Sequence, residues 1–269
     1  MDLMTKLRYQ GYLATPPLWY GKMVSKFKQI EFETNSVTFN DSLEFKSKRL
    51  GKLVEEFVFY QLKRQPSITW ICDNIQIQNG KRTIGEIDAL YYYEENPIHL
   101  EIVYKFYLYD RLKNYSESLA YWIGPNRKDS LLYKLNMLHN KQFPLLYNEI
   151  TSLNFEVRNL DIKIIKQHLC FKAQLFLPYH NRNIDVSPLN RHCLAGYFIG
   201  FKEIDFFKKF NFYIPVKLDW LVIPHHNVDW INYSSALKII ESEINHLRSP
   251  LVWLNKNDGE LNKCFITFW

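Results

Sequence analysis

The chain has 269 residues, of which 47% are hydrophobic and 16% aromatic. This content excludes general disorder, and the length suffices for one large domain or two small ones. The 34 lysine and arginine residues outnumber the 28 aspartate and glutamate residues, which gives a net charge of +6. Such mild basicity permits an anionic partner without requiring one.

Cysteine spacing and the N-terminal composition indicate the compartment. The four cysteines are scattered without a CxxC pair, so a disulfide scaffold is excluded and a reducing cytoplasm fits best. The first twenty residues lack the apolar core and cleavage site of a signal peptide. No apolar run approaches the roughly 18 to 20 residues of a membrane span. We therefore expect a soluble, cytoplasmic protein with no membrane partner, and leave its oligomeric state open.

Residues 45–64 carry apolar side chains at spacings of three, four and seven, which predicts an amphipathic helix after an N-terminal extension, residues 1–44. Gly51 and Glu55 lie four apart on one face of it. The glycine would let a backbone or a nucleic acid strand come close to the carboxylate. The alternative is that Glu55 is a surface residue paired with Lys52 or Lys63.

Three antiparallel strands are predicted to follow this helix. Residues 68–78 alternate isoleucines with polar residues, and Asn79-Gly80 is a strong hairpin signal. A second turn at residues 94–97 joins two further arms, residues 83–93 and 98–107. The polar faces of these two arms can therefore coincide.

The two arms place ionisable side chains on those polar faces. Glu86 and Asp88 share one face of the first arm, because side chains alternate along a strand. In the second arm Glu101 and Lys105 lie opposite an apolar face formed by Leu100, Ile102, Tyr104 and Phe106. Two carboxylates and a lysine at one point suit Mg2+-assisted phosphodiester chemistry. The alternative is a solvated hairpin with an ordinary Glu/Lys pair.

A second helix is predicted to begin near Pro125 and to run to about Lys141. Asn126, Arg127 and Lys128 would stand in its first turn, where backbone N–H groups and basic side chains can hold a phosphate. The alternative is a helix cap with solvated charges.

A strand in residues 160–178 completes the order helix, three strands, helix, strand. This order predicts an α/β core over residues 45–180. Residues 181–269 are rich in strand-forming side chains and predict a β-rich C-terminal lobe packed on that core. Its expected elements are strands at 193–201, 212–224, 250–254 and 264–269 and a helix at 234–248.

Four motifs occur along the chain, together with Lys134. They are Leu50-Gly51-x-x-x-Glu55, Gly85-Glu86-x-Asp88, Glu101-x-x-x-Lys105-Phe106-Tyr107-Leu108 and Trp122-x-Gly124-Pro125-Asn126-x-x-Asp129. With the order of the elements, they resemble the PD-(D/E)XK nuclease superfamily. Within it, the nearer resemblance is to an uncharacterised bacterial domain-of-unknown-function family, and it spans nearly the whole chain.

This resemblance implies a restriction-endonuclease-like core and a role for four residues. Asp88 and Glu101 would bind the metal, Lys105 would be the active-site lysine, and Glu55 would be the auxiliary acid of the first helix. The superfamily usually has Glu-x-Lys, whereas here Val103 takes the position of that lysine. Lys105 stands two residues later, about 6.6 Å further along the same face, and a long side chain can reach back.

The leading hypothesis is a nuclease that uses Mg2+ or Mn2+ to hydrolyse DNA or RNA. Two alternatives belong to other classes: a catalytically inactive nuclease-like fold that binds nucleic acid or protein, and a plain interaction domain. Tyr91, Tyr92, Tyr93 and Tyr107 could stack bases or simply form the core. The absence of GxSxG, GxxxxGK[ST], GxGxxG and HExxH patterns argues against hydrolases, NTPases, dinucleotide enzymes and zinc proteases of the usual types.

Overall fold

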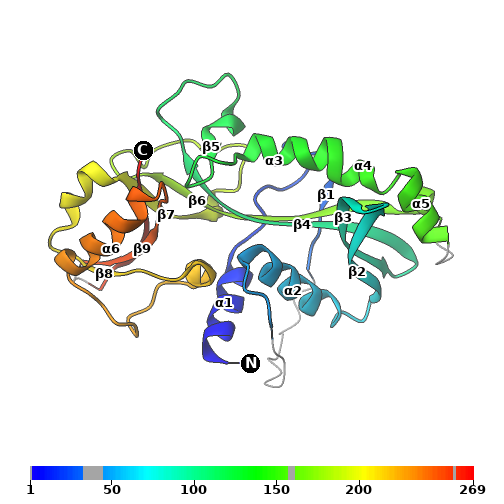
Figure 1. Ribbon diagram of the computed structural model, residues 1–269, viewed down its shortest axis with the longest axis horizontal. Coiled ribbons are helices and arrows are strands. Elements are labelled where there is room, and N and C mark those ends of the chain that lie inside the picture. Colours follow the sequence, from blue (N-terminus) through cyan, green and yellow to red (C-terminus); the bar gives the residue numbers. More distant parts are fainter. Residues whose placement is uncertain (1, 33–44, 157–160, 257–258) are drawn as a thin grey trace.

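The computed structural model describes residues 2–32, 45–156, 161–256 and 259–269. Within these residues, one mixed sheet of ten strands extends through the molecule (Figure 1). The predicted α/β class is confirmed at this level. The strands are β1 (Lys28–Gln29), β2 (Ile68–Asn79), β3 (Arg82–Tyr93), β4 (Asn96–Tyr109), β5 (Trp122–Ile123), β6 (Lys166–Pro178), β7 (Leu194–Gly200), β8 (Asn211–Tyr213), β9 (Leu251–Asn255) and β10 (Leu261–Thr267).

The order across the sheet is β2-β3-β4-β6-β7-β10-β9-β8, with β1 on β6 and β5 on β4. The strands β4, β6, β7 and β10 run parallel, whereas the outer pairs are antiparallel. Both predicted hairpins form, with Asn79 opposite Arg82 and Tyr93 opposite Asn96. The strands of the expected C-terminal lobe thus continue the sheet of the expected core.

Helices cover both faces of this sheet. The first two lie on one face, and α3 and α4 lie on the other (Figure 1). None of the helices in the described ranges is long and apolar enough to cross a membrane. The α-helices are α1 (Leu3–Ala14), α2 (Leu50–Leu62), α3 (Leu131–Met137), α4 (Phe143–Leu145), α5 (Glu149–Glu156) and α6 (Tyr233–Asn245). The 3-10 helices are η1 (Ser118–Tyr121), η3 (Ile162–Ile164), η4 (Arg191–Cys193), η5 (Phe201–Phe207) and η6 (Lys217–Leu221), and η2 (Leu138–Gln142) is a π-helix.

The central strand β4 is buried on both faces, as a parallel strand covered by helices requires. The apolar side chains predicted for one face, from Leu100 to Phe106, pack with those of α1 and α2. Val103 and Tyr107 point the other way and pack with Leu131 of α3. Tyr91 and Tyr107 are therefore core residues, whereas Tyr93 is exposed.

The second predicted helix begins later than expected. Residues 124–129 form a turn in which Gly124 N–H donates to the Asp129 carbonyl at 2.8 Å. Ser130 then caps α3 by accepting from Tyr133 N–H, so the helix begins at Leu131. Placing Asn126, Arg127 and Lys128 in a first helical turn was therefore wrong, because the Ser130 cap decides where the helix starts.

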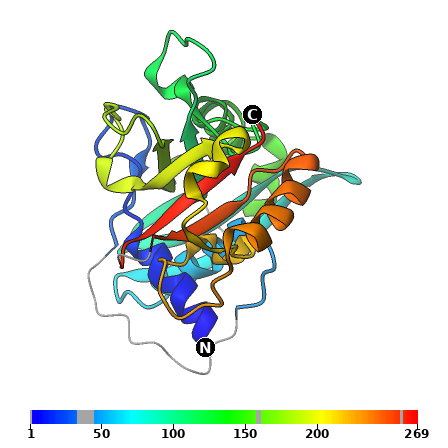
Figure 2. The ribbon, with the colours of Figure 1, turned by 90° about the vertical axis from the view of Figure 1, so that its left-hand side faces the viewer.

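Two strand predictions need correction. Of the expected 212–224 strand, only Phe212 and Tyr213 form, as part of β8, because Pro215 cannot donate to a ladder and the 3-10 helix η6 follows. In the 160–178 region, β6 begins at Lys166 after η3, and residue 160 lies outside the described residues. The remaining C-terminal elements form near their predicted positions, and α6 packs against the strands in yellow to red in Figure 2.

One close approach fixes α1 against η6. A Cβ added at Gly11 would lie 1.9 Å from the Leu221 carbonyl oxygen. We expect Gly11→Ala to lower the free energy of unfolding by about 1–3 kcal/mol, because the backbone of η6 must move. Gly51→Ala is the matched control, since a Cβ there meets nothing within 4 Å. Thermal unfolding followed by circular dichroism measures both; an equal effect at the two sites would contradict this account.

Candidate functional site

The site is built where β3 separates from β4. These strands pair only from Ala89 to Tyr93, opposite Asn96 to Leu100. Asp88 is the first residue past the paired segment, and its Oδ2 accepts the backbone N–H of Ile102 at 2.8 Å. A side chain thus takes the place of the missing strand partner, which holds the Asp88 carboxylate in a buried fork between the two strands.

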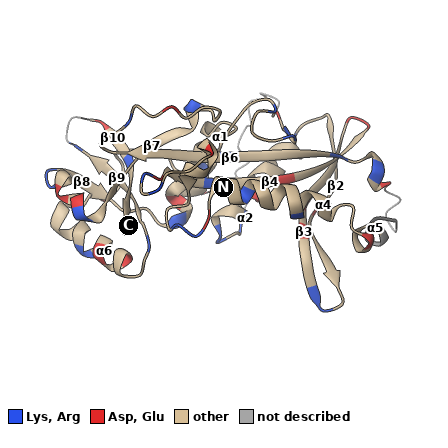
Figure 3. Ribbon diagram, turned by 90° about the horizontal axis from the view of Figure 1, so that it is seen from above, with Lys and Arg blue, Asp and Glu red and all other residues tan. Residues whose placement is uncertain are grey.

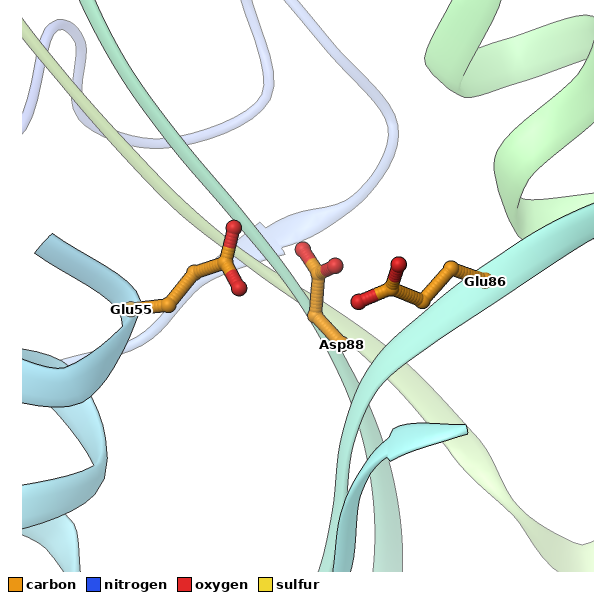
Figure 4. A group of neighbouring side chains, drawn as sticks. All are labelled: Glu55, Glu86 and Asp88. Atoms are coloured by element: carbon orange, nitrogen blue, oxygen red, sulfur yellow. The ribbon is translucent and has the colours of Figure 1, made fainter. Parts of the chain in front are cut away.

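Three carboxylates meet at this fork. Glu55 comes from α2, while Glu86 and Asp88 come from β3, and one oxygen of each lies within 4.8 Å of the other two. Figure 4 shows the three groups pointing toward one another. The Lys52 ammonium bonds Glu55 Oε2 at 2.7 Å and also contacts Glu86. The predicted alternative for Glu55, a pair with Lys52, is therefore present, but inside an acidic cluster rather than on an open surface.

Burial and the repulsion of neighbouring carboxylates change the pKa values of Glu55 and Asp88. Burial, followed by the charge of Asp88, raises the pKa of Glu55 to about 7. Burial, followed by the charge of Glu101, raises the pKa of Asp88 to about 7, although the Ile102 N–H opposes this shift. Acids with raised pKa values in one small volume are typical of sites that receive a cation.

Glu101 lies behind this cluster and is fully buried. Its Oε1 is 3.0 Å from His99 Nε2, and its Oε2 accepts from Gln142 Nε2 at 2.8 Å. Burial raises the pKa of Glu101 to about 8 and lowers that of His99 to about 4, so each favours its neutral form. The structure brings Glu101 close enough to affect Asp88, but its oxygens are held by these two neighbours.

Besides Lys52, a second lysine lies near the acids, and it is not the predicted Lys105. Lys105 forms an ion pair with Asp129 from the turn before α3. Lys134, on α3, lies near enough to Glu101 and Asp88 for their charges to raise its pKa, although burial lowers it overall. Its Nζ donates to Gln142 Oε1 at 2.5 Å, and Gln142 in turn reaches Glu101. Lys105 does not reach back to Glu101 because Asp129 binds it where it stands.

A cleft of about 630 Å³ opens beside the acids and includes Glu55 in its wall. It lies between the first turn of α2, residues 102–106 of β4, the turn before α3 and η6. Its lining is strongly cationic. The basic residues in it are Lys48, Arg49, Lys105, Lys128, Lys134 and Lys217, against two acids, Glu55 and Asp129.

The three residues predicted to bind nucleic acid differ in the contacts that they make. Lys128 lines the cleft. Asn126 also borders it, but its Oδ1 accepts the Ser249 N–H at 2.8 Å. Arg127 bonds both carboxylate oxygens of Asp110 and lies over the Trp269 ring, with its guanidinium carbon 4.6 Å from the ring centroid. Of the three, only Lys128 lines the cleft and has no side-chain hydrogen bond or ion pair with another described residue.

One known family model matches most of the chain. A family model described as Domain of unknown function (DUF1853) matches residues 12–265. The chain belongs to the DUF1853 family. No curated protein and no solved structure matches it. The expected membership of a domain-of-unknown-function family is confirmed, and the wider PD-(D/E)XK relationship stays a prediction.

Two residues of this DUF1853 site were not predicted as site residues. Glu86 stands in the Gly85-Glu86-x-Asp88 motif, and strand alternation already placed it on the face of Asp88. That signal was sufficient to find it. Lys134 was named with the motifs but given no role, because it comes from α3 and its position near the acids depends on packing across the sheet.

The raised pKa values make the stability of the metal-free protein depend on pH. Between about pH 5 and 8 Glu55 and Asp88 hold more protons in the folded chain than in the unfolded one, so these two acids make the free energy of unfolding fall as pH rises. Other buried groups act in the opposite direction: His99 and His168, whose pKa values burial lowers to about 4, do so in the acidic part of this range, and Lys263, whose pKa burial lowers to about 7, does so in its upper part. For Asp88 the loss is at most about 4 kcal/mol, from a pKa shift from 3.8 to about 7. We expect the Tm of the wild type in EDTA to fall relative to that of Asp88→Asn as pH rises over this range, and Mn2+ to restore the wild-type Tm at the upper end.

Differential scanning calorimetry of Asp88→Asn tests this expectation. The amide oxygen can still accept the Ile102 N–H, but the group no longer titrates, so the fall of Tm with pH that Asp88 causes is lost. Glu241→Gln, at an exposed position on α6, is the control and leaves the wild-type dependence unchanged. A difference in Tm between wild type and Asp88→Asn that does not change with pH over this range would contradict the titration described for Asp88.

Proposed function

We propose that this DUF1853 chain is a nuclease that uses Mg2+ or Mn2+ to hydrolyse phosphodiester bonds in DNA or RNA. The observation that carries the proposal is the convergence of Glu55, Glu86 and Asp88 beside a cleft lined by six lysine and arginine side chains. An acidic group alone would repel a phosphodiester. The combination suits a polyanion bound through cations, with its scissile bond next to the acids.

The donor set fits a hard divalent cation. Three carboxylates supply oxygen ligands of the kind that Mg2+ and Mn2+ prefer, and they converge without a thiol or imidazole among them. Glu55, Glu86 and Asp88 would hold such an ion. When bound, it supplies Lewis-acid polarisation of a phosphoryl oxygen and a lower pKa for bound water.

Other side chains and backbone groups of the chain would bind and orient the phosphate. Lys134 places an ammonium near Asp88 and Glu101, where it can offset charge that builds up on the phosphoryl group. Gln142 joins Lys134 to Glu101 and so fixes both side chains. The first turn of α2 borders the cleft, and no side chain caps its free N–H groups, which adds donors for phosphate oxygens beside Arg49.

We also propose that the core belongs to the PD-(D/E)XK superfamily. The order α2, β2, β3, β4, α3, β6 supports this, as does the position of α2 and α3 on opposite faces of the sheet. In this proposal the active-site lysine has moved from β4 to Lys134 on α3. Lys105, held by Asp129, remains in the cleft as a binding residue.

Cleavage assays with linear, nicked, branched and single-stranded substrates test the activity. We expect the wild type to cut at least one of them in Mg2+ or Mn2+ and to be inert in EDTA. Asp88→Ala and Glu86→Gln remove ligands, and we expect each to lower the rate by about 100-fold or more. If wild type and Asp88→Ala are equally inert on every substrate, the enzyme proposal fails.

A matched pair of lysine variants tests the position of the active-site amine. Lys134→Met removes the amine beside the acids, and we expect a rate loss of about 100-fold. Lys105→Met is the control, because that lysine pairs with Asp129, and we expect only a weaker substrate affinity. The reverse order of the two effects would return the active-site role to Lys105.

Charge reversal in the turn before α3 separates binding from folding. We expect Lys128→Glu to weaken nucleic acid binding at unchanged Tm, with a loss that shrinks as salt concentration rises. Arg127→Glu breaks the pair with Asp110, so we expect it to lower Tm first. Filter binding and thermal unfolding measure these effects. If both variants leave every nucleic acid affinity unchanged, the chain acts as a protein interaction domain instead.

A further inference from the structure

The hairpin of β2 and β3 continues well beyond the acidic cluster. Its end stands away from the rest of the molecule in Figure 3, with basic residues at the tip. We call residues 75–86 the ribbon. The turn of the ribbon is Gly80-Lys81, with Gly80 at φ +59°, a conformation that favours glycine. The ribbon starts at Glu86, so it leads directly outward from the proposed cleavage site.

One face of the ribbon is attached to the protein. Ile77 and Ile87 are fully buried and pack with Leu146. Gly85 also lets the neighbouring Leu145 approach the ribbon, because a Cβ at Gly85 would lie 2.5 Å from a methyl carbon of Leu145. The ribbon is therefore fixed in direction by packing at its base, and a partner bound to its other face does not have to order a loose hairpin.

The opposite face is a stripe of uncharged hydrogen-bonding side chains. Gln78 Nε2 lies 3.2 Å from Gln76 Oε1 and 2.8 Å from Thr83 Oγ1, so these three side chains share a face. All three are exposed. Gln76 is directly opposite Glu86 in the antiparallel register, so the stripe begins beside the acidic cluster.

The ribbon is acidic at its base, at Glu86, and basic at its tip, at Lys81 and Arg82. No acidic residue occurs from position 74 to position 85, and Lys81 and Arg82 occupy the tip. Both are exposed, and neither has an ion pair among the described residues. Arg82 is four residues from Glu86, or about 13 Å, the length of about four base-pair steps. A polyanion crossing the acidic cluster would meet the basic tip at that distance.

We propose that the ribbon enters the major groove of duplex DNA lying across the acidic cluster. A two-stranded ribbon fits this groove, whose edges offer donors and acceptors to glutamine amides. Lys81 and Arg82 then meet the phosphates at the groove edge. Proteins hold single strands mainly on aromatic side chains, which the stripe lacks, and the major groove of duplex RNA is too deep and narrow. The identity of the partner as nucleic acid rests on the proposed function.

Binding measured by fluorescence anisotropy in EDTA tests this inference with the full-length chain. The probes are a short duplex DNA, its single strand and a duplex RNA of the same sequence. We expect duplex DNA to bind most tightly. For the double variant Lys81→Ala, Arg82→Ala, we expect the negative slope of log K against log salt to become shallower by about 1.8, because two phosphate contacts are lost. For Gln76→Ala, Gln78→Ala, duplex affinity falls about fivefold or more at an unchanged slope.

The control is the double variant Lys202→Ala, Lys238→Ala, which removes the same charge from exposed positions remote from the ribbon. We expect it to bind like the wild type. Ribbon variants that bind duplex DNA like the wild type overturn the inference. Single-stranded DNA or duplex RNA bound as tightly as duplex DNA also overturns it.

Cleavage by the same preparations separates the two proposals. If cleavage depends on Asp88 but the ribbon variants bind duplex DNA like the wild type, the nuclease proposal stands and the ribbon proposal fails. If the ribbon variants lose duplex binding but the wild type cuts no substrate, the ribbon proposal stands and the nuclease proposal fails.

Discussion

The hydrogen bond from Ile102 N–H to Asp88 determines most of what is distinctive in this structure. A buried backbone N–H needs an acceptor, and here β3 has already turned away from β4. The carboxylate meets that need and keeps the fork from closing. The edge of β4 beyond Ile102 is consequently free to form one wall of the cleft, and β3 is free to continue into the ribbon. A single side chain thus links strand divergence, the cleft and the position of the acids.

Local patterns predicted the parts of the fold that local chemistry decides. The two hairpins follow from Asn79-Gly80 and from the turn at residues 94–97, and α2 follows from its apolar spacing. The start of α3 was misplaced because Pro125 and Ser130 both resemble helix starts, and only the turn at 124–129 decides between them. The pairing of β7 with β6 and of β10 with β7 joins segments that are distant in the sequence, and no local motif predicts it.

The candidate site divides in the same way. Asp88 and Glu55 came from motifs in single elements, and the structure places them together with Glu86. Lys105 was assigned from its face and distance on β4, but the sequence does not reveal that Asp129 reaches it across a turn. Lys134 shows the limit most clearly, because its role depends on where α3 crosses the sheet. Residue type and strand face are therefore readable from sequence, whereas the pairing of charges between distant segments is not.

Four acids gather at this fork, and the structure stabilises them unequally. Glu101 is the most deeply buried; burial raises its pKa, and His99 and Gln142 contact its two oxygens. Glu55 and Asp88 titrate near neutrality, and Lys52 partly balances Glu55 and Glu86. Because His99 and Gln142 contact the two Glu101 oxygens, the three acids that face one another are the ones placed to receive a ligand. A divalent cation would therefore bind the outer three, and the inner carboxyl would support the site through its contacts with His99 and Gln142.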